Sequence, residues 1–148
     1  MRWFMYKFKF QKVLEYRKSI EDQKKNILGL YTKSYLNAKE DLDKLHHSLQ
    51  YSNDMMEQQV NTGVSINELR SMYEEQNYYR EGIRNKTKVL IKAEEDVKQG
   101  RFELVKAMQN KKTMERLKEI YYKEYQYDEQ RKFEKHIEEI VSFKECGK

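Results

Sequence analysis

The residues that most often carry out chemistry in proteins are few in this chain and poorly placed for it. The histidines are His46, His47 and His136, and the single cysteine is Cys146. On a helix, the adjacent His46 and His47 would point about 100° apart, so they cannot share a metal ion as an i, i+4 pair can. No residue close in sequence is placed to activate the Cys146 thiol. We therefore expect a protein that is not an enzyme and that holds neither a metal ion nor a cofactor.

The aromatic and basic residues are better candidates for binding a partner. The twelve tyrosines are many for a coiled coil, and several stand in clusters, such as Tyr121 with Tyr122. Tyrosine tolerates half-exposed helix positions, but it is also enriched at protein interfaces. The first twelve residues contain four basic side chains and no acidic one: Arg2, Lys7, Lys9 and Lys12. Within them, the stretch "YKFKF" alternates aromatic and basic residues, a pattern that also suits the surface of a membrane.

The composition favours long helices over a thick globular core. Charged residues make up 37% of the 148 residues, no proline is present and there are only five glycines. Lys, Glu, Gln and Leu lose little side-chain freedom in a helix, so this composition suits a coiled coil. Intrinsic disorder is the rival interpretation, because it shares the high charge and low hydropathy. Heptad periodicity decides between the two.

Charge and cysteine content also limit the cellular setting. The net charge of +5 comes from 30 basic and 25 acidic residues spread along the chain, whereas nucleic-acid binders usually concentrate their cations. One cysteine cannot build a disulfide framework, and no apolar run has the roughly 20 residues needed to span a bilayer. We expect a cytoplasmic protein that binds no nucleic acid.

Apolar residues recur every seven positions in two long segments, which predicts two helices with narrow apolar seams. The first segment has two columns. One, which slips by one residue before Tyr35, consists of Val13, Ile20, Ile27, Tyr35, Leu42, Leu49 and Met56. The column beside it consists of Phe10, Arg17, Lys24, Tyr31, Ala38 and Leu45. The second segment has a main column without a slip, which consists of Leu69, Gln76, Ile83, Leu90, Val97 and Leu104. Its companion column is half polar and consists of Ile66, Tyr73, Arg80, Thr87, Glu94, Arg101 and Met108.

Between the segments, "NTGVS" is the strongest helix-breaking cluster, and Ser65 with Glu68 forms a capping-box pattern. We therefore predict an all-α fold, a long antiparallel two-helix coiled coil or helical hairpin. Its helices would cover about 10–60 and about 66–143, joined by a turn near 61–65 at Gly63, in a single domain 1–148. Phe10 would then lie opposite a residue near 116, and the last thirty or so residues would extend past the first helix.

With these features in place, the chain resembles the flagellar FliJ proteins of bacterial type III export. The resemblance rests on three motifs in order that together span the chain: "FKFQKVLEYRKSIEDQKK", "NTGVSINELRSMYEEQNYY" and "DEQRKFEKHIEEIVSFK". It implies a fold like the central stalk of rotary ATPases. It also implies the partners: the hexameric flagellar export ATPase, the cytoplasmic domain of the export-gate membrane protein, and export chaperones that the protein helps to recycle.

The resemblance further implies where partners would bind. The end that enters the ATPase ring would present Lys7, Lys9, Lys12, Lys118, Tyr121 and Tyr122. The family's gate-facing positions fall near Leu45, Glu75, Tyr79, Gly82 and Lys86, of which Glu75 and Lys86 differ in type from the family. The protein would be cytoplasmic and peripheral at the inner face of the cell membrane, associated with it through the export apparatus, and would serve flagellum assembly and motility.

Three other functions fit the same residues. The equivalent stalk of a virulence type III secretion system shares the fold and mechanism, and only genomic neighbours or a named partner would separate the two. A generic coiled-coil scaffold would not stimulate an ATPase. A basic coiled coil that binds RNA or DNA would lose affinity steeply as salt rises.

Overall fold

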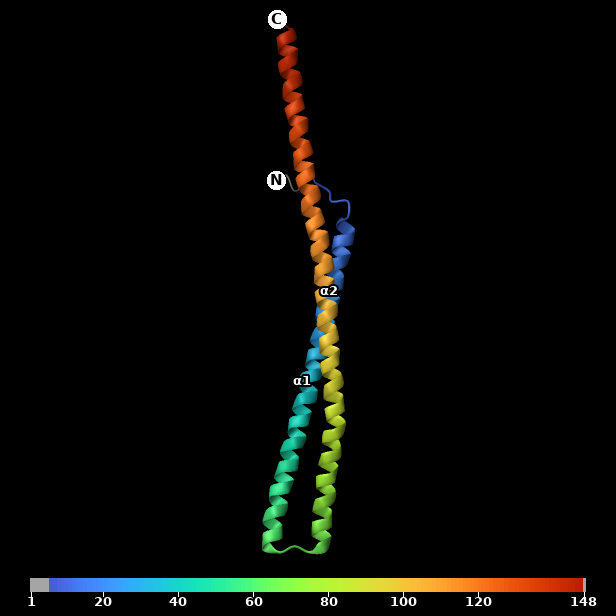
Figure 1. Cartoon of the computed structure of the whole chain (residues 1–148), viewed down its shortest axis with the longest axis vertical. Coiled ribbons are helices and arrows are strands. Elements are labelled where there is room, and N and C mark those ends of the chain that lie inside the picture. Colours follow the sequence, from blue (N-terminus) through green and yellow to red (C-terminus); the bar gives the residue numbers. More distant parts are fainter. Residues whose placement is uncertain (1–5, 148) are drawn as a thin grey trace. The chain divides into compact units, whose positions relative to one another are not determined.

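The computed structural model describes residues 6–147 and contains two long helices within them. Helix α1 covers Gln11–Thr62 and helix α2 covers Ile66–Cys146, with 52 and 81 residues respectively. They run in opposite directions on either side of a short turn (Figure 1). The absence of proline and the abundance of Lys, Glu, Gln and Leu allow helices of this length. The prediction of an all-α helical hairpin is confirmed.

The turn between the helices has the geometry that its sequence indicates. Gly63 has a φ of 95°, a left-handed conformation that glycine adopts without steric cost. Ser65 then caps α2, because its Oγ accepts from the Glu68 amide at 3.2 Å and its own amide donates to Glu68 Oε2 at 3.3 Å. This reciprocal pair is the predicted capping box. Thr62 does not cap α2; its hydroxyl donates back to the carbonyls of Gln58 and Gln59 in the last turn of α1.

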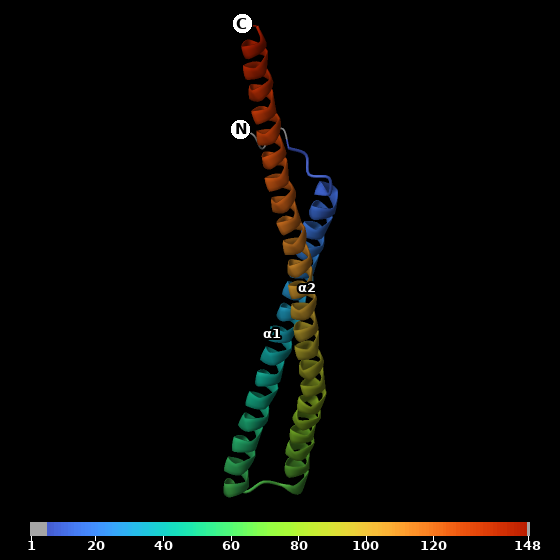
Figure 2. The same ribbon diagram turned by 45° about the horizontal axis from the view of Figure 1, so that its top comes forward.

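The chain divides into two compact units, and each helix contributes to both. The turn unit is Lys24–Leu104, and the terminal unit consists of the described residues of Met1–Gln23 and Val105–Lys148. Figure 2 shows the course of α1 and α2 from a second direction. That the whole chain forms one domain remains a prediction.

In the turn unit, small side chains allow α1 and α2 to approach closely. Ala38 on α1 and Ala93 on α2 are buried, and Val97 is 7% exposed. At Gly100 the two helices are tightly packed: a Cβ there would lie 3.1 Å from the ring of Tyr31 and 3.3 Å from Leu28. Tyr31 and Leu28 of α1 therefore occupy the space that the absent side chain of Gly100 leaves.

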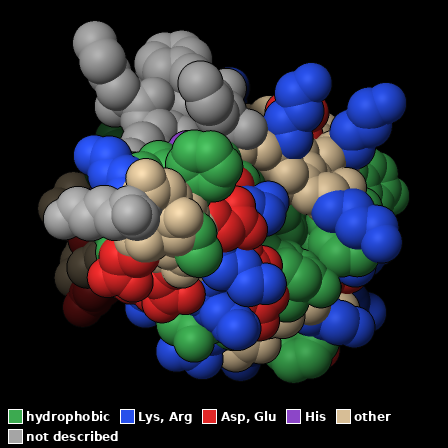
Figure 3. Space-filling model, turned by 90° about the horizontal axis from the view of Figure 1, so that it is seen from above, with side chains coloured by type: hydrophobic (Ala, Val, Ile, Leu, Met, Phe, Trp, Pro, Cys, Tyr) green, Lys and Arg blue, Asp and Glu red, His purple; other side chains and the backbone are tan. Residues whose placement is uncertain are grey.

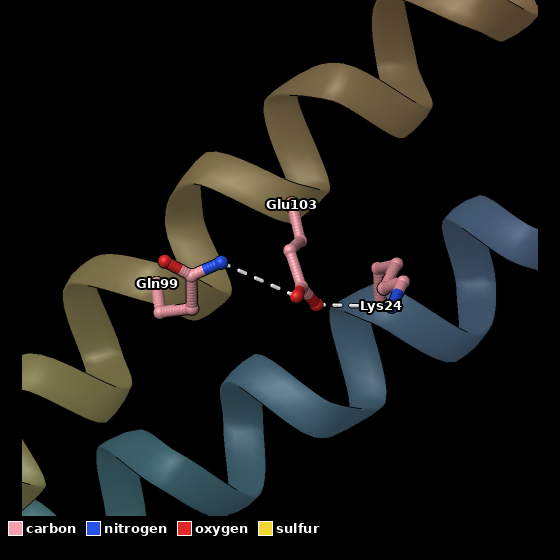
Figure 4. Close-up of polar contacts among 3 residues, drawn as sticks. All are labelled: Lys24, Gln99 and Glu103. Carbon is pink, nitrogen blue, oxygen red and sulfur yellow. Dashed lines mark hydrogen bonds and ion pairs between the residues drawn. The ribbon is translucent and has the colours of Figure 1, made fainter.

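Ion pairs between the helices flank this packing. Lys24 on α1 lies 2.9 Å from Glu103 on α2, and Gln99 donates to the other oxygen of Glu103 at 3.4 Å (Figure 4). Nearer the turn, Lys86 and Asp41 pair at 3.1 Å. Both pairs are partly exposed, so each contributes less than about 1 kcal/mol, and their main effect is to favour one register.

The predicted first column of α1 is wrong near its start. Val13 is 39% exposed whereas Leu14 is 2% exposed, so the inward positions are one residue later. They are Leu14, Glu21, Leu28 and Tyr35, and the burial pattern then continues in an unbroken heptad. The one-residue slip before Tyr35 is therefore absent. The error arose because a charged residue, Glu21, occupies an inward position while apolar Ile20 and Ile27 stand beside the seam.

The predicted companion column of α2 is also wrong. Ile66 and Tyr73 are 77% and 54% exposed, and of the whole column only Thr87 is half-buried. The inward companions are mostly small or polar: Tyr79, Lys86, Ala93, Gly100, Ala107 and Met114. The main column is right from Gln76 to Leu104, although Leu69 at its start is 37% exposed. Gln76 is buried, and its side-chain amide donates to Met56 Sδ at 3.0 Å.

Neither helix of the described chain has a segment long and apolar enough to cross a membrane.

Candidate functional site

The basic-aromatic start of the chain packs onto α2 through its aromatic side chains. Residues 6–8 are not helical and α1 begins at Gln11, whose amide donates to the Phe8 carbonyl at 3.1 Å. The rings of Tyr6 and Phe8 contact tyrosines of α2, whereas Lys7 and Lys9 are exposed to solvent. The alternation of aromatic and basic residues in the sequence therefore corresponds to an alternation of covered and exposed side chains.

Six rings form what we call the aromatic clasp: Tyr6, Phe8, Phe10, Tyr121, Tyr122 and Tyr125. The Tyr6 ring lies 5.4 Å from that of Tyr122 and 5.2 Å from that of Tyr125. Tyr121 contacts both Phe8, at 6.1 Å, and Phe10, at 6.3 Å. Tilted ring pairs at such distances each contribute about 0.5–1.5 kcal/mol beyond the area that they bury.

The clasp corrects the expected register at this end. Phe10 meets Tyr121, and Gln11 accepts a hydrogen bond from Lys118 at 3.0 Å, so Phe10 does not lie opposite a residue near 116. The prediction assumes a turn centred at Gly63, whereas the Phe10–Tyr121 and Gln11–Lys118 contacts correspond to a centre about two residues later. Burial, followed by the nearby charge of Glu124, raises the pKa of the Tyr6 hydroxyl.

The basic residues predicted to meet an ATPase differ in their accessibility. Lys7, Lys9 and Lys12 are exposed, and the Lys9 ammonium lies 5.7 Å from the centre of the Phe10 ring. Lys118 is half-buried because it bonds to Gln11 across the helix pair. Arg2 lies outside the described residues. Viewed from the C-terminal end of α2, basic side chains project among acidic and hydrophobic ones (Figure 3).

A buried ion pair lies farther along the terminal unit. Glu21 is 3% exposed, and its Oε2 is 2.7 Å from the Nζ of Lys111. The hydrogen bond to Glu21 raises the pKa of Lys111, and burial partly opposes this effect. Glu21 is not among the residues predicted from the sequence, although its seven-residue spacing from Leu14 and Leu28 is a signal for an inward position.

The residues predicted to face the export gate lie within the turn unit and pack against each other. Leu45 on α1 is half-buried, and its methyl groups lie 3.5 Å from where a Cβ of Gly82 would be. Tyr79 is also half-buried and donates its hydroxyl to Glu75 at 3.3 Å. Burial and the Glu75 carboxylate raise the pKa of Tyr79. Leu45 and Gly82 thus contribute to helix packing, and their role toward a partner remains a prediction.

Beyond Tyr125, α2 continues without cover from the other described residues. Every residue from 126 to 147 is exposed, including Phe133 at 64%, Ile137 at 44% and Ile140 at 45%. Local pairs such as Lys132 with Glu129 at 3.6 Å and Gln130 with Glu134 at 3.2 Å support the helix. This segment corresponds to the predicted extension past the first helix.

A groove lies between α1 and α2 next to the clasp, with a volume of about 430 Å³. Leu14 and Lys18 line it from α1, and Lys118, Tyr122 and Lys123 from α2. No group of three His, Cys, Asp or Glu residues is placed to hold a metal ion anywhere in residues 6–147.

Comparisons with known proteins agree with this architecture. A solved structure of a proposed YscO homologue, CT670 from Chlamydia trachomatis, superposes with a TM-score of 0.56 at 16% identity, covering 93% of this chain and 94% of that one. This likeness establishes the shared fold. Among curated proteins there is no sequence match. The sequence profile described as "Flagellar FliJ protein" matches residues 6–144, nearly the whole chain. The chain therefore belongs to the flagellar FliJ protein family.

Proposed function

We propose that this protein is a non-enzymatic coiled-coil component of flagellar type III protein export that binds the hexameric export ATPase through its terminal unit. Family membership over residues 6–144 is the observation that carries the proposal. The fold fits, because a long helix pair can reach into the pore of a ring much as the central stalk of a rotary ATPase does.

The terminal unit has properties that a contact with several ATPase subunits requires. The clasp holds the start of the chain on α2, so that Lys7 and Lys9 project from a defined surface. The exposed residues 126–147 add a single helix that a ring can surround. Exposed lysines at the edge of an interface mainly raise the association rate and make it sensitive to salt.

The proposal includes two further contacts, with the cytoplasmic domain of the export gate and with export chaperones. They would place the protein in the cytoplasm, at the inner face of the membrane, during flagellum assembly. Leu45, Tyr79 and Gly82 are all half-buried in the helix pair, so this contact would use the surface that they leave exposed.

Chemical cross-linking of the purified chain to its cognate export ATPase, with mass-spectrometric mapping, tests the proposal. We expect cross-links from Lys7, Lys9, Lys12 and Lys123, and faster ATP hydrolysis when the chain is present. Cross-links confined to the turn unit, or no change in hydrolysis, would refute this mode of binding. Deletion of the gene should abolish swimming; loss of toxin secretion with normal motility would instead assign the chain to a virulence system.

A further inference from the structure

The groove beside the aromatic clasp has Leu14 and Tyr122 at its floor and one exposed lysine on each of its two walls. Leu14, 2% exposed, contributes to the floor from α1, and half-buried Tyr122 lines it from α2. Lys18 on α1 and Lys123 on α2 are both exposed. Among the described residues, neither ammonium has a hydrogen bond or an ion pair. The ends of these side chains are therefore available to a ligand.

The clasp fixes the shape of this groove. Tyr122 reaches the groove and also contacts Tyr6, so the start of the chain supports one wall from behind. Lys118, which also lines the groove, is held across the helix pair by its bond to Gln11. Because these groups are already positioned, a ligand would lose less free energy in ordering them.

The charges around the groove select among classes of ligand. The segments 6–23 and 105–126 contain eleven basic and six acidic residues, whereas 24–104 contains thirteen of each. This excess favours an anionic partner. However, Glu115 and Glu119 also line the groove, and they would repel a dense polyanion such as a nucleic acid. A ligand with a few separated carboxylates and an apolar group avoids that repulsion.

We infer that the groove binds a short peptide segment of a partner protein in which an apolar side chain is flanked by acidic residues. The apolar side chain packs on Tyr122, next to buried Leu14, and the carboxylates pair with Lys18 and Lys123. The inference names the chemistry of the partner segment at the terminal unit, and its biological setting depends on the proposed function.

Fluorescence anisotropy with the full chain and a short labelled peptide, one leucine flanked by glutamates, tests this inference. We expect saturable binding that weakens as salt increases. It should be lost when the leucine is replaced by serine and weakened when the glutamates are replaced by glutamine. The double variant Lys18→Glu/Lys123→Glu should bind about tenfold more weakly at low salt, since two exposed attractions become repulsions.

The variant Lys88→Glu/Lys92→Glu is the matched control, because it changes the net charge equally at two exposed sites of the turn unit. Equal weakening by both variants, or equal binding of the glutamine peptide, would overturn the inference. So would a dimer of the unmodified chain that dissociates on the Lys18 and Lys123 reversals, because a second copy would then occupy the groove. Failure of the proposed function would look different: the ATPase would not respond to the chain, while peptide binding would be unaffected.

Discussion

The ring of Tyr31 on α1 lies over Gly100 on α2, where a Cβ would come within 3.1 Å of it. This relationship explains why a glycine occupies an inward position of α2. Glycine in the middle of a helix costs about 0.5–1 kcal/mol relative to alanine, and the close packing of Leu28 and Tyr31 offsets that cost. Gly29 has no such packing role, because nothing lies within 4 Å of the place where its Cβ would be.

Two glycine substitutions should therefore have opposite effects on stability. Gly100→Leu should lower the free energy of unfolding by about 1–3 kcal/mol, because the larger side chain forces Tyr31 and Leu28 out of place. Gly29→Ala should raise it by about 0.5–1 kcal/mol, because this exposed helical position gains helix propensity without a clash. Urea denaturation followed by circular dichroism measures both. A stabilising Gly100→Leu would show that the helices are not packed at this point.

Breaking the Glu21–Lys111 pair should destabilise the terminal unit. In Lys111→Met, the Glu21 carboxylate would stay buried without its cation, so the melting temperature should fall. In the double variant Glu21→Leu/Lys111→Met, the buried charge is also removed, and most of the loss should be recovered. Scanning calorimetry of the parent, the single variant and the double variant measures the three melting temperatures. Equal melting temperatures for the parent and the single variant would mean that Glu21 is accessible to water.

The same pair predicts how stability depends on pH. The pKa of Lys111 is raised in the folded protein, so its contribution is fully present below the ordinary lysine pKa near 10.5 and is lost as pH rises through the folded value. The raised pKa values of Tyr6 and Tyr79 act in the same direction, since both hydroxyls stay neutral more readily when folded. These three groups should thus leave the free energy of unfolding nearly constant from pH 7 upward until it falls in alkaline solution. The fall should be smaller in the double variant, which lacks the Glu21–Lys111 pair. Urea titrations across pH would contradict this if stability increased above pH 10.

The main column of α2 should be essential for folding. Replacing Leu90 and Val97 together by Asp would place two charges in the seam at a cost of about 2–5 kcal/mol each, against a total stability of about 5–15 kcal/mol. The double variant should be largely unfolded by circular dichroism at room temperature. The control Val89→Asp/Ile91→Asp changes side chains that are 50% and 54% exposed and should keep its helices. Identical melting of both double variants would mean that the buried face is assigned incorrectly.

The exposed end of α2 should matter for binding and little for folding. A chain ending at Tyr125 lacks only residues that are exposed where described, so the remaining helix pair should melt near the parent temperature. Stimulation of the export ATPase should be weaker, because the single helix is gone. Circular dichroism and an ATP hydrolysis assay separate the two effects. A large fall in melting temperature would show that the segment packs on the rest of the chain.

The sequence predicts the turn and the helical hairpin because strong local signals determine them. Gly63 and the Ser65–Glu68 pair specify the turn by backbone preference and by reciprocal hydrogen bonds, which need no knowledge of distant residues. The columns were harder to assign, because the inward positions carry residues without strong hydropathy. Gly100 contributes by being small and Glu21 by pairing with Lys111, and both effects depend on the opposite helix.

The environment of the candidate binding residues could likewise be predicted only where it depends on the local sequence. The alternation of Tyr6, Lys7 and Phe8 in the sequence matches the alternation of covered and exposed side chains in this non-helical segment. That Tyr121 and Tyr122 are engaged by this segment could not be predicted, because it depends on the register of α1 against α2. The groove at Lys18 and Lys123 depends on that register too.

The most direct test of the account is stimulation of the cognate export ATPase by a chain carrying Lys7→Glu, Lys9→Glu and Lys12→Glu. These side chains are exposed, so the helical content should match that of the parent, as it should in the control with Lys88, Lys92 and Lys98 reversed. At low salt, the concentration needed for half-maximal stimulation should increase about tenfold for the terminal variant and little for the control, with the difference shrinking as salt rises. Equal stimulation by the two variants at low salt would contradict docking through the terminal unit.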